Sequence, residues 1–230
     1  MKKVLVLVAA VLFGSLAFAE KSKELGVRFG GTFNFGTKFA SNELTSSFKD
    51  WASSYSEKIL IGYDISIFGH FGIVEMGKGA LSLQPEITFS SNNGKKMVTK
   101  FDGDTFETEF SYLCLDIALL VGYDIPVGER GFSIRPFLGP KVGIPLGKMF
   151  IVTEGPGSDY DSTDSIKVST TIGMDFGLAF SAQIGAKLVY GADVRYGFDF
   201  NYTKYKEDGI SMDVLRRAGM TIALRIGYKF

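Results

Sequence analysis

Cysteine, histidine and tryptophan each occur once in the 230 residues, and there are only six prolines. The single cysteine, Cys114, excludes an intramolecular disulfide and any redox or zinc site that needs paired cysteines. Few prolines, together with 28 glycines and 21 phenylalanines, do not match the composition of a disordered chain. The 25 basic and 25 acidic residues balance, so the charge gives no indication of a nucleic-acid partner.

Long hydrophobic runs are also missing, apart from one short run near the N-terminus. The first residues have a basic start, an apolar core and a small-x-small cleavage site. These parts are Lys2 and Lys3, residues 4–13, and Ala17 and Ala19 followed by Glu20. The apolar core is shorter than the ~20 residues that a membrane-spanning helix needs. We therefore predict a cleaved secretory signal peptide over residues 1–19 and a mature domain over residues 20–230.

In place of long apolar runs, the chain has apolar residues at every second position, the pattern of a strand with two different faces. The pattern is clearest at the C-terminal end, where the odd positions are small, polar or charged. The even positions there are Met220, Ile222, Leu224, Ile226, Tyr228 and Phe230. The same alternation predicts about eight strands, over residues 25–35, 59–68, 81–89, 112–123, 134–144, 170–180, 188–202 and 220–230.

The connections between these strands are alternately long and short. The four long, polar ones cover residues 37–57, 92–109, 145–165 and 203–216. Long extracellular loops and short periplasmic turns are typical of bacterial outer-membrane barrels. We therefore predict an all-β fold, an eight-stranded antiparallel up-and-down transmembrane β-barrel, surrounded by outer-membrane lipid and monomeric.

A soluble lipocalin-like binding protein of the periplasm also has alternating strands, but its apolar face points inward. Here the polar face is rich in glycine and alanine, which suit the narrow interior of an eight-stranded barrel. Aromatic residues gather near the predicted strand ends, where a membrane barrel has its interfacial girdles. Both features favour the membrane barrel over the soluble alternative.

The polar faces carry charges of both signs, and a narrow lumen with little water requires them to pair. We predict a lumen charge network of Arg28, Asp64, Glu86, Asp116, Arg135, Lys141, Asp175, Lys187, Asp193, Arg195, Asp199 and Arg225, with Lys229 beside it. Such a network fills the lumen, as side chains do in other small barrels. The alternative is a gated path through it, which would make the protein a porin-like channel for ions or small solutes.

Several smaller features carry further expectations. Pro85, Pro136 and Pro140 lie in predicted strands but lack an N–H donor, so we expect a β-bulge at each. Four apolar residues have helical spacing in the first long loop and predict either a short helix on the barrel rim or an aromatic contact surface. These are Leu44, Phe48, Trp51 and Tyr55.

No catalytic, cofactor or metal site is predicted. His70 falls in a predicted periplasmic turn, with no partner marked for general-base catalysis of a lipid-acting enzyme. Three aspartates in the third long loop could offer oxygens to calcium, but their spacing lacks the glycine of an EF-hand, which favours a solvated acidic loop. They are Asp159, Asp161 and Asp164.

Three segments and the last strand together resemble the PorT-like outer-membrane β-barrel proteins, which are near the eight-stranded OmpA-like barrels. The segments are LQPEITFSSNNGKK (83–96), SYLCLDIALLVGYDI (111–125) and IRPFLGPKVGIPL (134–146). Asp116 and Ala118 depart from the Ile-Pro that is usual in the family's fourth strand. The resemblance implies fold and location, and it implies a surface or secretion-complex protein as partner, because some members are linked to secretion machinery.

Taken together, these patterns predict a non-enzymatic outer-membrane barrel that anchors surface loops or stabilises the envelope. The outward residues of the last strand form the C-terminal signal that we expect barrel-assembly machinery to recognise. They are Ile226, Tyr228 and Phe230.

Overall fold

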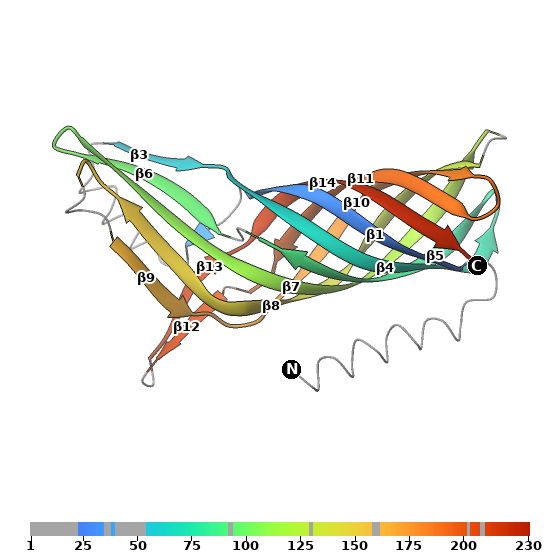
Figure 1. Ribbon diagram of the computed structural model, residues 1–230. Coiled ribbons are helices and arrows are strands. Elements are labelled where there is room, and N and C mark those ends of the chain that lie inside the picture. Colours follow the sequence, from blue (N-terminus) through green and yellow to red (C-terminus); the bar gives the residue numbers. More distant parts are fainter. Residues whose placement is uncertain are drawn as a thin grey trace.

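The computed structural model describes residues 23–34, 38–39, 54–91, 94–128, 131–157, 162–201, 203–207 and 210–230. Eight antiparallel strands form a closed ring (Figure 1). They are β1 (Lys23–Asn34), β4 (Leu60–Met76), β5 (Gly79–Ser90), β7 (Asp104–Val127), β8 (Phe132–Glu154), β10 (Thr171–Ile184), β11 (Leu188–Asp199) and β14 (Ala218–Lys229). Each pairs with the next in chain order, and β1 pairs with β14 to close the ring. The predicted eight-stranded up-and-down barrel is confirmed.

The apolar face of the barrel points outward. In β14, Leu224 is 70% exposed, whereas the neighbouring Ala223 and Arg225 are 2% and 5% exposed. The same alternation holds in β1, where Phe29 is 60% exposed and Arg28 is 2% exposed. This is the reverse of a lipocalin-like barrel, and it is the arrangement that a lipid environment requires.

Short turns join the strands at one end of the barrel and long connections join them at the other. Gly77 and Gly185 lie in two of the short turns with φ of 61° and 62°, a conformation that favours glycine. The first short turn is tighter than the sequence indicated, because β4 runs on to Met76. The C-terminal residue lies at this short-turn end (Figure 1).

The long connections contain strands that the alternation did not predict. These are β2 (Lys38–Phe39), β3 (Ser54–Lys58), β6 (Lys95–Phe101), β9 (Ser162–Lys167), β12 (Thr203–Glu207) and β13 (Ile210–Arg216). Strand β6 pairs with the outer half of β7, β9 pairs with that of β8, and β3 pairs with β6, which gives the order β3-β6-β7-β8-β9. We call this part the extension, because it continues the barrel wall beyond the rim (Figure 1). Strands β12, β13 and β2 form a separate three-stranded sheet.

The extension has its own sequence signal and a small core. Asp102 and Gly103, with φ of 49° and 90°, turn the chain from β6 into β7. Positive φ at both positions is the type I′ hairpin geometry that Asp-Gly favours, so this dipeptide could have indicated the hairpin. Cys114 is buried with Tyr112 and Met149 where the extension meets the barrel.

The bulges predicted at the three prolines are wrong. Strands β7 and β8 keep one register from Ala118↔Lys141 to Val127↔Phe132, and only the pairs at Pro140 and Pro136 and at one neighbour of each are missing. The β4–β5 ladder has the same kind of gap at Pro85. A bulge would turn the following side chains to the wrong face, whereas a gap in the ladder preserves the alternation. The register shifts lie elsewhere, at Gly72/Val74 and Ser111/Leu113.

Some predictions lie partly or wholly outside the described residues. These are the signal peptide with its cleavage site at Ala17, Ala19 and Glu20, the apolar residues Leu44, Phe48 and Trp51, and the acidic residues Asp159 and Asp161. Tyr55 belongs to β3 and Asp164 to β9, so neither lies in the helix or loop predicted for it. Within the described ranges, no helix is both long and apolar enough to cross a membrane.

Candidate functional site: the charged lumen

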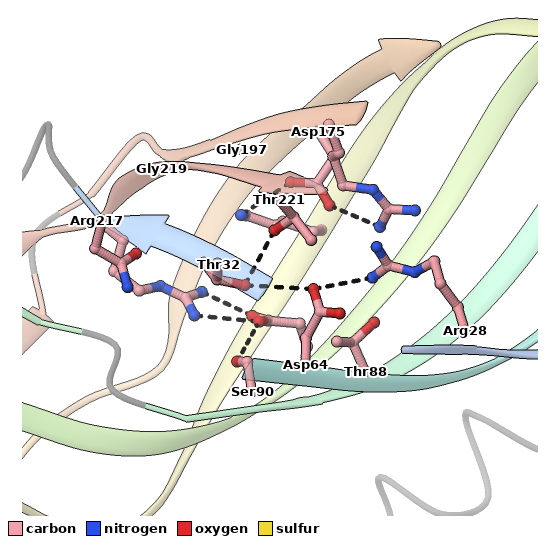
Figure 2. A pocket seen from close by; sticks show the side chains of 14 residues that line it. Arg28, Thr32, Asp64, Thr88, Ser90, Asp175, Gly197, Arg217, Gly219 and Thr221 are labelled. Carbon is pink, nitrogen blue, oxygen red and sulfur yellow. Dashed lines mark hydrogen bonds and ion pairs between the residues drawn. The ribbon is translucent and has the colours of Figure 1, made fainter. Parts of the chain in front are cut away.

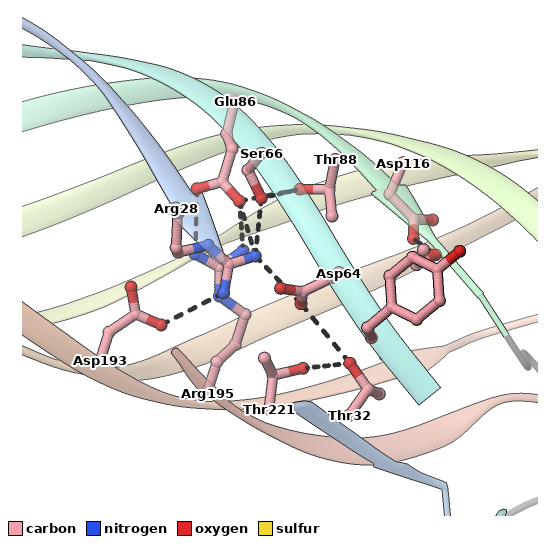
Figure 3. Close-up of polar contacts among 12 residues, drawn as sticks. Arg28, Thr32, Asp64, Ser66, Glu86, Thr88, Asp116, Asp193, Arg195 and Thr221 are labelled. Atoms are coloured by element: carbon pink, nitrogen blue, oxygen red, sulfur yellow. Dashed lines mark hydrogen bonds and ion pairs between the residues drawn. The ribbon is translucent and has the colours of Figure 1, made fainter. Parts of the chain in front are cut away.

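A layer of buried ion pairs crosses the middle of the lumen (Figure 3). Arg195 on β11 donates through both terminal nitrogens to the two carboxylate oxygens of Glu86 on β5, over 2.9 and 3.0 Å. Strands β5 and β11 are four strands apart in the ring of eight and therefore face each other across the barrel. A bidentate pair of this kind is among the strongest that side chains form. It joins opposite walls of the barrel.

Arg28 on β1 completes this middle layer. Its Nη2 lies 3.0 Å from Glu86 and 3.2 Å from Asp64, and its Nη1 lies 3.3 Å from Asp193. All the charged residues of the layer are at most 5% exposed. The ring of Phe137 lies against it, with the guanidinium carbon of Arg195 5.3 Å from the ring centroid. The layer therefore fills the lumen with paired charge and aromatic surface, and leaves little room for water.

On the long-loop side of the middle layer is a second group of ion pairs, around a cavity of about 50 Å³ (Figure 2). Arg217 lies 2.7 Å from Asp116 and 2.7 Å from Asp199. Lys141 lies 2.9 Å from Asp175. This group links β7 and β11 to Arg217, the residue just before β14, and β8 to β10.

On the short-turn side is a larger cavity of about 420 Å³, which we call the vestibule. It is lined by Glu24, His70, Asp124, Arg135, Gln183, Arg225, Lys229 and residues of the short turns. His70 bridges two carboxylates, with Nε2 3.0 Å from Asp124 and Nδ1 3.5 Å from Glu24. Arg225 lies 3.1 Å from Glu24, and its guanidinium carbon is 4.2 Å from the ring centroid of Phe68. None of the described residues lines both cavities.

A closed ring of eight strands with an apolar exterior and a polar interior is the architecture of small outer-membrane barrels. The family described as outer membrane protein beta-barrel domain matches residues 18–203. The chain belongs to this family.

Solved structures similar to the chain come from several bacteria. Neisserial surface protein A is 14% identical with a TM-score of 0.45, covering 90% of this chain and 99% of that chain. OprG from Pseudomonas aeruginosa is 12% identical with a TM-score of 0.46, covering 92% and 98%. A major outer membrane protein from Thermus thermophilus is 13% identical with a TM-score of 0.48, covering 91% and 100%. The comparison with curated protein sequences found no match.

Almost all residues of the predicted lumen network face the interior of this outer-membrane barrel. The exception is Lys187, for which the prediction is wrong. It lies in the turn between β10 and β11, is exposed, and holds its ammonium 5.4 Å from the ring centroid of Tyr228. Period-two alternation does not extend into a turn, so the odd residue number of Lys187 does not indicate where its side chain points. Lys229 lines the vestibule.

The sequence reasoning missed several lumen residues whose position was available from the same alternation. Glu24 has an even residue number, like the lumen-facing Arg28, and Arg217 has an odd one, like the lumen-facing Arg225. Both lie just beyond the predicted strand boundaries. His70 was placed in a turn, whereas it lies in β4 because that strand is longer than predicted. Asp124 lies in β7, one residue beyond the predicted end of that strand. Extending each pattern by a few residues would have found all four.

The extension carries a polar contact outside the lumen. Lys58 lies 2.6 Å and Lys96 2.8 Å from the two carboxylate oxygens of Glu107. The hydrogen bond from Lys58, supported by that from Lys96, lowers the pKa of Glu107 to about 2. The hydrogen bond to Glu107 raises the pKa of Lys96.

Among the described residues, no group of three or more His, Cys, Asp or Glu is arranged to hold a metal.

Proposed function

We propose that this outer-membrane barrel is non-enzymatic and has a sealed lumen, and that its role is carried by its long-loop end. The observation that supports this most strongly is the bidentate Arg195–Glu86 pair, which joins opposite walls through buried groups. A solute crossing the lumen would have to separate this pair and leave two buried charges uncompensated, which is costly. The protein would then serve as an anchor for surface-exposed strands or as a stabilising element of the envelope.

Conductance across a planar bilayer tests the sealed lumen. We expect no steady nanosiemens conductance from the native protein, because the two cavities are separated by the middle layer. The combined variant Glu86→Ala and Arg195→Ala removes both partners and leaves no isolated charge, so it should open a measurable path. The combined variant Lys58→Ala and Glu107→Ala removes an ion pair from the extension and should leave the conductance unchanged. Steady conductance from the native protein would contradict the proposal.

The second candidate function is a porin-like channel for ions or small solutes. It is favoured by the two cavities, of about 50 and 420 Å³, which approach the middle layer from both sides. In that case the Arg28, Glu86 and Arg195 layer would be a gate. Native conductance that rises when the membrane potential is changed would favour this candidate over the sealed barrel.

We propose that the extension is the surface through which the barrel contacts a protein partner. The support is that the described strands of the extension project beyond the barrel rim as an ordered sheet. The PorT-like motifs at residues 83–86 and 134–146 support the finer assignment to that branch of the family, some of whose members are linked to secretion. Replacing residues 97–107 with a short turn should leave a folded barrel and abolish partner cross-linking at the cell surface.

We further propose that the monomer reaches the outer membrane by cleaved export and assembly-machinery recognition of its last strand. The support is the outward position of Ile226, Tyr228 and Phe230, which are 48%, 49% and 58% exposed. The mature N-terminus should be Glu20. The variant Phe230→Ser should reduce the level of folded protein in the outer membrane, whereas the polar substitution Ile184→Ser on another outward position should not.

A further inference from the structure

Two cations of the vestibule differ from the other lumen cations in their partners. Arg135 on β8 donates through Nη2 to the side-chain oxygen of Gln84, and Lys229 donates to the side-chain oxygen of Gln183 over 2.8 Å. Both acceptors are neutral amides. Neither cation forms an ion pair with a carboxylate of the described residues, whereas every other lumen cation described above does. The direct partners of these two positive charges are therefore neutral amides rather than carboxylates.

Arg135 is the more unusual of the two, because it is only 3% exposed. Its buried Nε has no hydrogen-bond partner, but the same is true of Arg28, Arg195 and Arg225, so the neutral acceptor is what distinguishes Arg135. A guanidinium has five N–H donors, and leaving them unsatisfied away from water is unfavourable. Arg225 lies close by, since it also approaches the same oxygen of Gln84, at 3.5 Å. Two guanidinium groups at one amide oxygen repel each other, and of the two only Arg225 has a carboxylate of the described residues, Glu24, within ion-pair distance.

Three carboxylates line the vestibule, and each has a partner: Glu24, Asp124 and the exposed Glu75. Glu24 pairs with Arg225 and with His70, and Asp124 pairs with His70. Arg135 and Lys229 both line a cavity of about 420 Å³. A volume of this size is within the range of small-molecule sites, about 300–1,000 Å³. Residues of the short turns line the rim of the cavity, so a solute would enter from the periplasmic end.

We propose that the vestibule is a binding site for a small soluble oxyanion, a carboxylate- or phosphate-bearing molecule, held by Arg135 and Lys229. Arg135 supplies the planar, fixed donors that match two oxygens of such a group. Lys229, on the closing strand, adds a mobile cation at the rim. The site lies on the periplasmic side of the middle layer, so it does not depend on whether the lumen conducts.

The test uses the full mature protein in a non-ionic detergent, so that no lipid or detergent phosphate competes. Inorganic phosphate and acetate are the probes, and sodium chloride at equal ionic strength is the reference. We expect phosphate to bind saturably in calorimetry and to slow unfolding in urea more than chloride does. Arg135→Gln should weaken phosphate binding about tenfold or more, the effect of losing a charge-assisted hydrogen bond. Lys229→Gln should weaken it less, because that ammonium is only half-buried.

The matched control is Lys148→Gln, which removes one positive charge from an exposed position in β8. It should leave phosphate binding unchanged. Heat-modifiable gel migration checks that each variant is folded. In addition, Arg135→Gln should raise the stability in the absence of phosphate, since it removes a buried charge that has no direct ion pair with the described residues. Equal phosphate protection of the native protein and the folded Arg135→Gln variant would overturn the proposal, as would the absence of saturable binding to the native protein.

Discussion

Glu86 is the residue on which the middle layer of the lumen converges. Its two carboxylate oxygens accept hydrogen bonds from Arg195, Gln84 and Thr88, and Arg28 lies within ion-pair distance. Both lone-pair regions of each oxygen are therefore used. This saturation is what makes a charged group tolerable at 1% exposure.

We predict that Glu86→Gln lowers the free energy of unfolding by about 3–5 kcal/mol, the cost of removing one partner from a buried ion pair. The new amide NH₂ would face guanidinium donors and leave two buried arginines short of negative charge. Urea unfolding in phospholipid vesicles, followed by circular dichroism of the strands, measures the change. The control Glu154→Gln, at an exposed position of β8, should change the stability little. Equal stabilities of the two variants would show that the layer contributes nothing.

The glycines on the inner face make room for the ion pairs. A methyl group at Gly143 would overlap Arg217, Thr171 and Asp116. We predict that Gly143→Ala destabilises the barrel by about 1–3 kcal/mol, as overpacking does in other cores. Gly31 offers a matched control, because nothing lies within 4 Å of a methyl group there. Gly31→Ala should be neutral or stabilising in the same unfolding experiment, and a loss as large as that of Gly143→Ala would contradict the explanation.

Which residues face the lumen was predictable from parity, but which of them pair was not. Glu86 and Arg195 are 109 residues apart in the chain. Their contact depends on the register of every strand between them and on the closure of β1 against β14. Alternation specifies the side of a strand to which a residue points, and it carries no information about height along the barrel axis.

At the scale of single elements, the medium on each face of a strand determines whether its apolar and polar residues alternate, and therefore whether the sequence predicts it. The predicted strands border lipid on one face and the lumen on the other, so their residues alternate clearly. In the extension, β9 is exposed or half-buried along its whole length. Strands with water on both faces need no apolar stripe, and their residues therefore resembled polar loops. The Asp102–Gly103 turn was the remaining local signal.

The ion pairs of Glu107 link β3 and β6 to β7, and we predict that they persist to low pH. The folded pKa of Glu107, about 2, lies below its ordinary value of 4.5, so the stabilisation is complete above pH 4.5 and is lost as the pH falls through 2. Amide hydrogen exchange in β6, compared between the native protein and Glu107→Gln at each pH, measures the effect. Slower exchange in the native protein should be seen at about pH 5 and should disappear near pH 2. A difference that is independent of pH would contradict the assignment.

At the scale of the whole molecule, the barrel reverses the distribution of apolar and charged residues that is found in a soluble protein. Its exterior carries a continuous apolar band, and its described interior is rich in charged and polar side chains, with small apolar clusters such as Ala118, Leu120, Phe137 and Ala179. The apolar side chains are therefore buried by lipid rather than by the protein interior. The ion pairs of the lumen favour one register of the strands over the others. The stability of the folded state thus depends on the solvent that surrounds it.

This dependence gives a prediction for Leu224, which lies near the middle of β14 and is 70% exposed. Leu224→Arg should lower the free energy of unfolding in phospholipid vesicles by about 2–4 kcal/mol, the cost of arginine on the lipid face near the bilayer midplane. Phe150→Arg is the control, because Phe150 is also exposed but lies on the part of β8 that belongs to the extension. It should cost far less, since its side chain faces water rather than hydrocarbon. If the two arginines cost the same, the apolar band of β14 is not in contact with lipid.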